Sequence, residues 1–169
     1  VGALYVRRGT AIEPFVRGAG HERGLRPGTE NVLEIVGLGM ACELVERDLH
    51  EEIPRLRLLR DQLRTLLIAR IPDLVEHGHP EHRLPNTLSV AFPGVEAAEV
   101  LSRLENDVAA SAGAACHEGG AVLSHVLWAM GVEPDIARST LRLSIGRFTS
   151  DADLQPGARR IIDAIEAAR

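Results

Sequence analysis

The chain has 169 residues, 45% of them hydrophobic and 25% charged, with a formal net charge of −5 at pH 7. This length suits one good core, or one and a half small domains, and the composition is ordinary for a soluble globular protein. The negative charge argues against a nucleic-acid partner, no apolar run is long enough to cross a membrane, and two cysteines make no disulfide framework, which favours the cytoplasm.

The first third of the chain predicts a strand, a loop and a long helix. Residues 1–6 are typical of a buried strand already under way at Val1, so its pairing neighbours are expected upstream. Residues 11–30 are rich in Gly and Arg and predict an ordered loop or a short hairpin. Apolar residues then recur at helical spacing from Glu30 to about Ile71, with Thr29 expected as the N-cap and a kink or break at Ile53-Pro54.

The pattern changes after Pro72. Residues 74–78, 86–92, 108–113 and 140–146 are strand-like, and helical runs are expected at 96–105, at 122–130 and from Asp151 to the end, where Pro156 would delay the helix. The sequence therefore predicts an α/β fold: a long linking helix, then a small domain with a sheet on one side and covering helices on the other.

Cys116 stands in the segment SAGAACHEGG, among residues that offer little apolar area. A free cysteine is usually a buried small hydrophobe, and Cys42, beside Met40 and Leu44 on an apolar helix, fits that description. Cys116 does not. The surrounding glycines permit motion, and His117 and Glu118 could influence the fraction of thiolate, so we favour a reactive thiol at Cys116 over a structural one.

Arg142 lies in the predicted strand TLRLSIG. Alternation puts Leu141, Leu143 and Ile145 on one face and Arg142 with Ser144 on the other. Arg142 is then either an ordinary outward-facing arginine or a forked donor for a carboxylate, held on a rigid strand.

Two further segments have weaker signals. Residues 17–31 hold several arginines and glycines and lead into a helix N-terminus, where backbone amides suit a phosphate, although a solvated loop explains the same pattern. His77, His79 and His82 lie in a segment interrupted by Gly and Pro and without cysteine partners. That segment favours a polar surface turn over a metal site, so no metal is expected.

Together, these segments resemble the C-terminal part of the cysteine desulfurases and the related selenocysteine lyases, which are pyridoxal-phosphate-dependent enzymes of the class V aminotransferase group. The matching motifs, in order, are GALYVRRGT, GAGHERGLRPGTENV, RLPNTLSVAF, ASAGAACHEGG and TLRLSIGRFTSDAD. The resemblance implies the α/β fold of a fold type I transferase. It implies that residues 1–50 end a large cofactor-binding domain and that residues 51–169 form the long helix and small domain with the cysteine loop.

The resemblance also implies roles for three residues. Cys116 takes the position of the nucleophile whose thiolate removes sulfur from L-cysteine, leaving a persulfide on a mobile loop and releasing L-alanine. Arg142 takes the position that grips the substrate carboxylate. Thr29 matches a residue that reaches the phosphate of pyridoxal 5'-phosphate in the partner subunit's site, which implies a homodimer, and the persulfide implies a sulfur-acceptor protein.

The departure from the family is that all 19 cationic residues are arginine, so the chain has no lysine to hold the cofactor. The chain is therefore expected to be a fragment that is inactive alone, because the family's lysine lies just before the segment VGALYV. Three alternatives remain open: the selenocysteine lyase branch, which GAACH resembles; a non-catalytic dimerisation or regulatory remnant of the family; and a small thiol protein that uses Cys116 alone.

Overall fold

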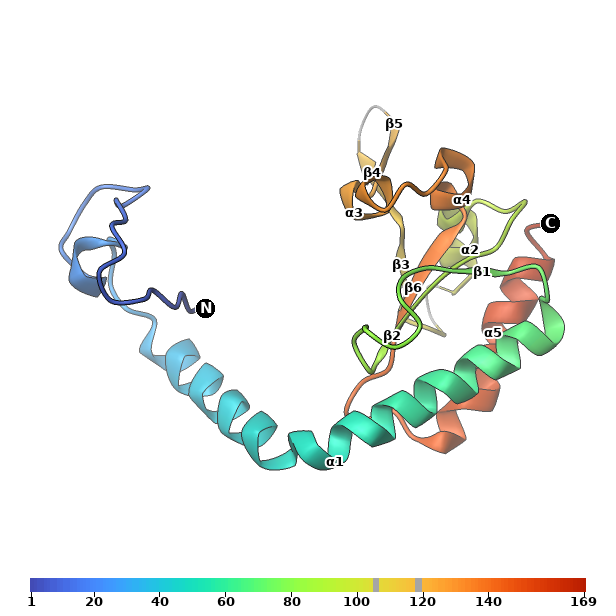
Figure 1. The fold of residues 1–169 in the computed structure, drawn as a ribbon, viewed down its shortest axis with the longest axis horizontal. Helices are drawn as coiled ribbons and strands as arrows, with labels where there is room; N and C mark the ends of the chain where they lie inside the picture. Colours follow the sequence, from blue (N-terminus) through green and yellow to red (C-terminus); the bar gives the residue numbers. More distant parts are fainter. Residues whose placement is uncertain (105–106, 118–119) are drawn as a thin grey trace. The chain divides into compact units, whose positions relative to one another are not determined.

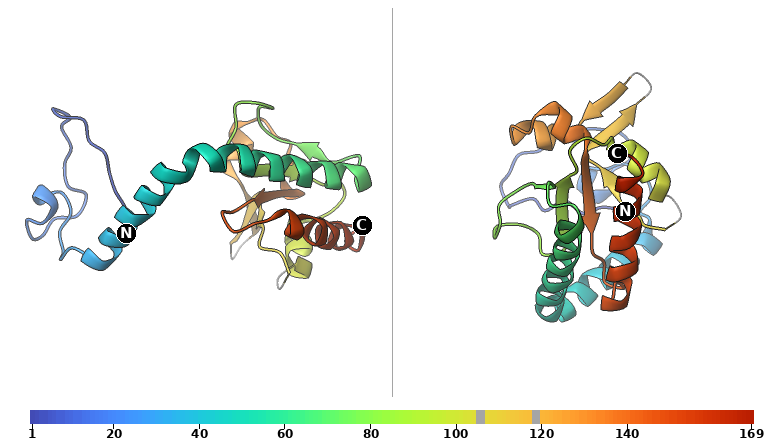
Figure 2. Two further views of the ribbon diagram at one scale, coloured as in Figure 1. Left: turned by 90° about the horizontal axis from the view of Figure 1, so that it is seen from below. Right: turned by 90° about the vertical axis from the view of Figure 1, so that its right-hand side faces the viewer.

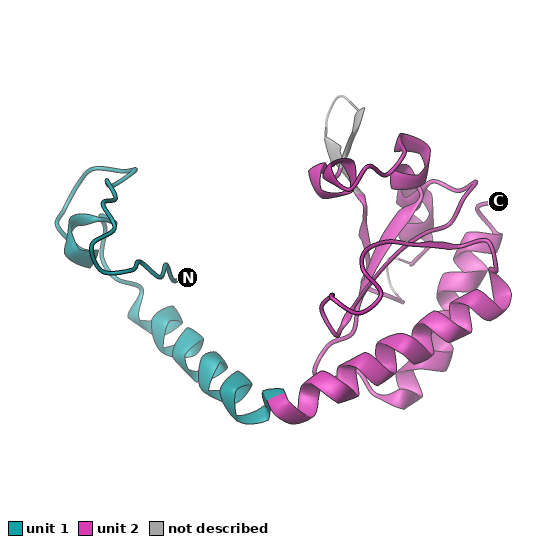
Figure 3. Ribbon diagram, in the orientation of Figure 1, with its two compact units in different colours: residues 1–49 teal, residues 50–169 magenta. Residues whose placement is uncertain are grey.

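The computed structural model describes residues 1–104, 107–117 and 120–169, with strands 114–117 and 120–123 described by their backbone only. It divides into two compact units, Val1–Leu49 and His50–Arg169, which Figure 3 colours separately. Each unit is treated by itself below. No helix among the described residues combines the length and the hydropathy that crossing a membrane requires.

The first unit has little regular structure before its helix. It contains a short 3-10 helix, η1 (Glu22–Gly24), and then the start of α1 (Val32–Arg70). The predicted strand at residues 1–6 is wrong: the segment is irregular and exposed. A strand is stable only when its backbone groups are paired, and within the first unit no segment pairs with residues 1–6.

Helix α1 begins two residues later than predicted. Its first helical hydrogen bond runs from the Ile35 amide to the Asn31 carbonyl (3.0 Å), and Asn31 Oδ1 accepts the Glu34 amide at 3.3 Å. Both bonds identify Asn31 as the N-cap, a position that asparagine fills well. The expected capping role of Thr29 is therefore wrong.

The helix is not broken at Pro54 and continues to Arg70. Proline removes one backbone hydrogen bond of the helix. The residue after it, Arg55, donates side-chain hydrogen bonds to the carbonyls of Thr149 (2.8 Å) and Arg147 (2.9 Å), which attach this turn to the segment after β6. Beyond this point Leu59, Leu63 and Leu67 are buried at a spacing of four residues, as one face of a helix requires.

Four strands form one antiparallel sheet in the spatial order β1-β2-β6-β3. They are β1 (Val75–Glu76), β2 (Thr87–Ala91), β6 (Thr140–Ser144) and β3 (Ser111–Ala112). All four lie inside the segments that the sequence predicts as strands. A separate two-stranded hairpin, β4 (Ala114–His117) with β5 (Gly120–Leu123), follows β3 and was not predicted.

Helices cover one face of this sheet and form the core with it (Figures 1 and 2). They are the second half of α1, α2 (Ala97–Leu104) and α5 (Asp151–Glu166). Two short helices, α3 (His125–Ala129) and α4 (Pro134–Arg138), complete the unit; α3 is shorter than predicted, because Val122 and Leu123 belong to β5. The predicted α/β arrangement, with a sheet on one side and helices on the other, is confirmed.

Helix α5 begins at Asp151 despite Pro156 in its second turn. A capping box explains the early start: Ser150 and Asp153 satisfy each other's backbone amides, and Asp153 Oδ2 accepts the Ser150 amide at 2.8 Å. The predicted delay at Pro156 is therefore wrong. The apolar face of the helix, including Leu154, Ile161 and Ile165, lies in the core.

Candidate functional site

The outer face of the sheet, which we define as the side away from α1, α2 and α5, is where the structure places Arg142. Leu141 and Leu143 of β6 are buried in the core, whereas Arg142 and Ser144 are exposed. The alternation predicted from the sequence is confirmed. A rigid central strand thus presents a guanidinium to an open face.

A row of polar residues crosses the outer face at the level of Arg142. In the strand register Arg142 lies opposite Ser89 of β2 on one side and Ser111 of β3 on the other. The His77 amide donates to the Ser89 carbonyl at 2.9 Å, so the row continues to His77, the residue that follows β1 at the edge of the sheet. Arg142 Nη2 donates to Ser111 Oγ at 3.3 Å. Sequence reasoning missed Ser89 and Ser111, because alternation assigns a face but not a partner.

His77 is half-buried and held in one orientation. Its Nε2 lies 3.0 Å from Thr140 Oγ1, and the Thr140 hydroxyl donates to the Ile136 carbonyl at 2.8 Å. Because the only hydroxyl proton of Thr140 is used there, His77 Nε2 must carry the proton of the shared hydrogen bond. Burial lowers the pKa of His77, so the neutral ring is favoured.

A small cavity of about 130 Å³ lies beside His77 and is also lined by Arg83, Leu84, Thr87 and Ser89. The charge of Arg83 is already neutralised by Glu76, and its guanidinium also donates to the His79 carbonyl at 2.5 Å. The cavity therefore adds a neutral imidazole and two hydroxyl side chains to the outer face.

Cys116 lies in strand β4, where its Cα pairs with that of Ala121. The segment expected to be a mobile loop thus has the backbone of a hairpin. The side chain of Cys116 is outside the described part of the structure, so its role stays a prediction.

The base of this hairpin is fixed at Gly113, between β3 and β4. The Gly113 amide donates to the Thr140 carbonyl at 2.7 Å, and the Gly113 carbonyl accepts the Ser124 amide at 2.9 Å. A Cβ atom at this position would lie 2.8 Å from Thr140 Cβ and 2.7 Å from Leu127 Cδ1, closer than ordinary contacts allow. Glycine is required here because the backbone packs against β6 and α3.

Cys42 is exposed on the first half of α1, which contradicts the expectation of a buried cysteine. The helix predicted from the spacing of its apolar neighbours is present, but within the first unit no other element covers the apolar face of that helix. Within residues 1–49, all of which the structure describes, no residue is buried.

Thr29 lies in the first unit, where Arg26 orders the turn that leads into α1. Arg26 Nη1 donates to the carbonyls of Gly28 (3.1 Å) and Thr29 (3.3 Å), and Gly28 adopts φ +100°, which favours glycine. The phosphate-binding role of Thr29 stays a prediction.

Of the three histidines 77, 79 and 82, His79 and His82 lie in an exposed polar turn, whereas His77 is half-buried beside β2. His79 Nδ1 accepts the amides of Glu81 and His82, both at 3.0 Å. Across the described residues, no group of three or more His, Cys, Asp and Glu side chains is placed to hold a metal ion.

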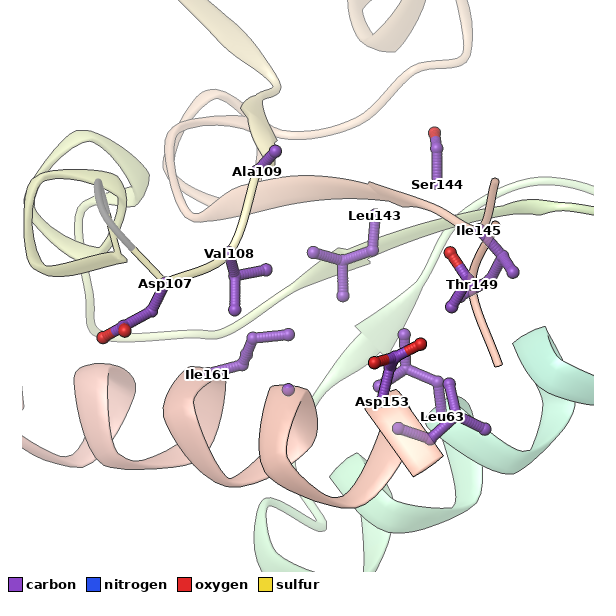
Figure 4. Close-up of a pocket in the computed structure, with 12 residues that line it drawn as sticks. Leu63, Asp107, Val108, Ala109, Leu143, Ser144, Ile145, Thr149, Asp153 and Ile161 are labelled. Carbon is purple, nitrogen blue, oxygen red and sulfur yellow. The ribbon is translucent and has the colours of Figure 1, made fainter. Parts of the chain in front are cut away.

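A second pocket, of about 310 Å³, lies between β6 and α5 (Figure 4). Its walls are apolar core residues such as Leu143 and Ile161. Of the polar groups at its rim, Thr149 accepts the Gly146 amide and Asp153 caps α5. These groups already serve the fold, so the outer face around Arg142 is the better candidate site.

Comparison with known proteins extends the sequence resemblance. The family model described as aminotransferase class-V matches residues 1–156. A cysteine desulfurase of Gluconacetobacter diazotrophicus is 44% identical over 166 residues, covering 98% of this chain and 40% of that protein. The cysteine desulfurase NifS of Azotobacter vinelandii is 39% identical over 162 residues, covering 95% of this chain and 40% of that protein.

A solved structure has the same fold. A NifS-like protein superposes with a TM-score of 0.82 at 31% sequence identity, covering 96% of this chain and 41% of that chain. The chain thus spans about 40% of the length of the curated relatives it matches. The resemblance inferred from the sequence motifs is confirmed.

Proposed function

Because the chain belongs to the aminotransferase class-V family, we propose that it is the C-terminal part of a cysteine desulfurase that depends on pyridoxal 5'-phosphate. The observation that carries this proposal is the pairing of β3 with β6. In this pairing Arg142 lies beside Ser111 of β3, and Cys116 follows five residues later in the chain. A carboxylate ligand thus comes from β6, and a thiol from the hairpin strand β4 that directly follows its neighbour β3.

Arg142 binds the carboxylate of L-cysteine in this proposal. The guanidinium has five N–H donors in a planar fork, which matches a carboxylate with two parallel hydrogen bonds. Its position in the middle of β6 fixes the origin of the side chain, so the substrate is oriented as well as bound.

Cys116 accepts the sulfur. Its thiolate attacks the sulfur of the bound cysteine, a sulfur–sulfur bond forms and the carbon–sulfur bond breaks. Protonation at that carbon completes L-alanine, so one cysteine and one thiol give one alanine and one persulfide without an outside oxidant. An acceptor protein then takes the persulfide sulfur.

The cofactor, when bound, supplies the electron sink that makes the carbon–sulfur bond labile. No side chain of these 169 residues can hold it as an imine, because the sequence has no lysine. The covalent attachment therefore comes from outside them. Thr29 contributes to the phosphate site of the partner subunit, so the working enzyme is a homodimer, and a persulfide-forming thiol fits the reducing cytoplasm.

The first test compares alanine variants at the two cysteines in the full-length protein. Cys116→Ala should abolish persulfide and alanine formation while cysteine still binds, because only the sulfur acceptor is lost. Cys42→Ala is the matched control and should turn over at the parent rate. Persulfide is measured by mass spectrometry and alanine by chromatography. Parent-rate turnover by Cys116→Ala would remove the thiol from the mechanism.

The second test concerns Arg142. Arg142→Ala should lower kcat/KM by roughly ten- to a hundredfold, since a hydrogen bond to a charged group is worth about 1.5–3 kcal/mol. Arg142→Lys should restore only part of the activity, because a point charge lacks the planar fork. Arg159→Ala, which changes an exposed residue of α5, is the control. Normal cysteine binding by Arg142→Ala would refute the carboxylate role.

A comparison of substrates separates the remaining alternatives. Faster turnover of selenocysteine than of cysteine by the full-length protein would place it in the selenocysteine lyase branch. Absence of turnover with both would favour the non-catalytic remnant.

A further inference from the structure

Arg142 has a specific neighbour on its own face of the sheet. Its Nη2 donates to Ser111 Oγ at 3.3 Å, and the two residues lie directly opposite each other in the antiparallel register of β3 and β6. Directly opposed residues in such a pair point to the same side of the sheet. The contact thus follows from the strand pairing and does not depend on a long loop.

The backbone that carries Ser111 is fixed close to the contact. Two residues further on, the Gly113 amide is bonded to the Thr140 carbonyl of β6, and the space around Gly113 leaves no room for even a methyl group beside Thr140. The hydroxyl of Ser111 is therefore held relative to β6 at a distance that the sheet itself determines.

The contact matters because the side chain of Arg142 is exposed. An exposed arginine loses much rotational freedom when it binds a ligand. A hydroxyl that accepts one of its five N–H groups restricts the plane of the guanidinium beforehand. Four donors remain, which is enough for a two-point contact with a carboxylate.

We propose that Ser111 is a positioning residue that orients the guanidinium of Arg142 for the substrate carboxylate. The inference rests on the proposed function of Arg142 and adds a residue to it. Because Ser111 belongs to the strand that enters the Cys116 hairpin, the same strand then orients the carboxylate ligand and supports the sulfur acceptor.

The experiment is a double-mutant cycle in the full-length protein, with Ser111→Ala, Arg142→Ala and the double variant. Ser111→Ala should lower kcat/KM for cysteine roughly three- to tenfold, and mainly through KM. The donor is charged, but the contact is long and exposed, so its effect should be that of a modest hydrogen bond. In the Arg142→Ala background the same change should have no further effect, because the group that Ser111 orients is absent. Ser111→Thr keeps a hydroxyl and should restore most of the loss.

Two controls separate orientation from a general structural effect. Ser144→Ala removes a hydroxyl from the same strand and face as Arg142 and should stay within about twofold of the parent, as surface substitutions do. Binding of cysteamine, which is cysteine without its carboxylate, should be the same in Ser111→Ala and in the parent. Weaker cysteamine binding would mean a disturbed site and would overturn the proposal.

The outcomes also distinguish the positioning role of Ser111 from the carboxylate-binding role of Arg142. If Arg142→Ala is impaired but Ser111→Ala equals the parent, or loses the same factor in both backgrounds, the positioning role is wrong and the carboxylate role stands. If Arg142→Ala itself matches the parent, the carboxylate role of Arg142 is wrong, and the role of Ser111 falls with it.

Discussion

Glu76, at the end of β1, binds two arginines at one edge of the candidate site. Arg64 of α1 donates to its Oε2 at 2.5 Å, and Arg83 binds its Oε1. Burial alone would raise the pKa of Glu76, but hydrogen bonds from Arg64 and Arg83 outweigh it and the pKa is lowered. The ion pairs thus join α1, β1 and the polar turn next to His77.

Glu76→Gln should destabilise the protein by about 1 kcal/mol at pH 7, between the values for exposed and buried ion pairs. A lowered pKa in the folded state gives stability that is fully present above the ordinary glutamate pKa of about 4.3 and is lost as the pH falls through the lowered value. Urea unfolding of parent and variant should therefore differ at pH 7, and the difference should shrink as the pH falls below the ordinary glutamate pKa. A difference that is constant with pH would show that the charge is irrelevant.

The hairpin base at Gly113 sets the position of two elements, β3 and β4. Gly113→Ala would place a methyl group 2.8 Å from Thr140 Cβ and 3.1 Å from the Ala137 carbonyl, neither of which is a flexible side-chain end. Overpacking of this kind costs about 1–3 kcal/mol. We expect a lower midpoint in thermal unfolding and, in the full-length protein, slower persulfide formation.

Gly157→Ala in α5 is the matched control for this substitution. Nothing lies within 4 Å of a Cβ at Gly157, so alanine should raise stability by about 0.5–1 kcal/mol through helix propensity. Equal effects of the two glycine substitutions would contradict the crowding at Gly113.

At the scale of elements, the sequence predicted what depends on local pattern. Alternation identified the outward face of Arg142 in β6, and the helical spacing of apolar residues identified α1. That spacing runs through both halves of α1, so it did not show that only the second half is buried. The strand order and register that bring Ser111 to Arg142 depend on pairing between segments 31 residues apart, which no local pattern contains.

The predictions that failed have the same cause. Half of the residues in β4 and β5 are Ala or Gly, and the two strands have no apolar period, so only backbone pairing defines the hairpin. Cys42 has an apolar helical pattern around it but no covering layer within the first unit. A pattern shows which face is apolar, and tertiary contacts decide whether that face is buried.

At the scale of the whole molecule, the two units differ in how many of their side chains are buried. The described core lies entirely in His50–Arg169. In Val1–Leu49 large apolar side chains such as Leu4, Tyr5 and Phe15 are exposed, and no residue is buried. Local unfolding should therefore cost least in the first unit.

Limited trypsin digestion of the 169-residue chain should accordingly cut first after Arg7, Arg8 or Arg17, outside the helices. A fragment that retains the second unit should accumulate, and mass spectrometry would identify its first residue. Arg159 and Arg160 in α5 are internal controls, since that helix packs on the core. Cleavage at Arg159 or Arg160 before any site in the first unit would show that residues 1–49 are the more stable part.

The absence of lysine has a consequence for the chemistry of the whole chain. A covalent imine with pyridoxal phosphate needs a free primary amine, and arginine stays protonated at any ordinary pH. In these 169 residues the α-amine of Val1 is then the sole primary amine. After acetylation of Val1, incubation with pyridoxal phosphate and reduction with borohydride should leave the mass of every internal peptide unchanged. The unacetylated chain is the control and should gain one pyridoxyl group, on Val1. A reduced pyridoxyl group on any internal peptide would contradict the conclusion that the covalent attachment lies outside these residues.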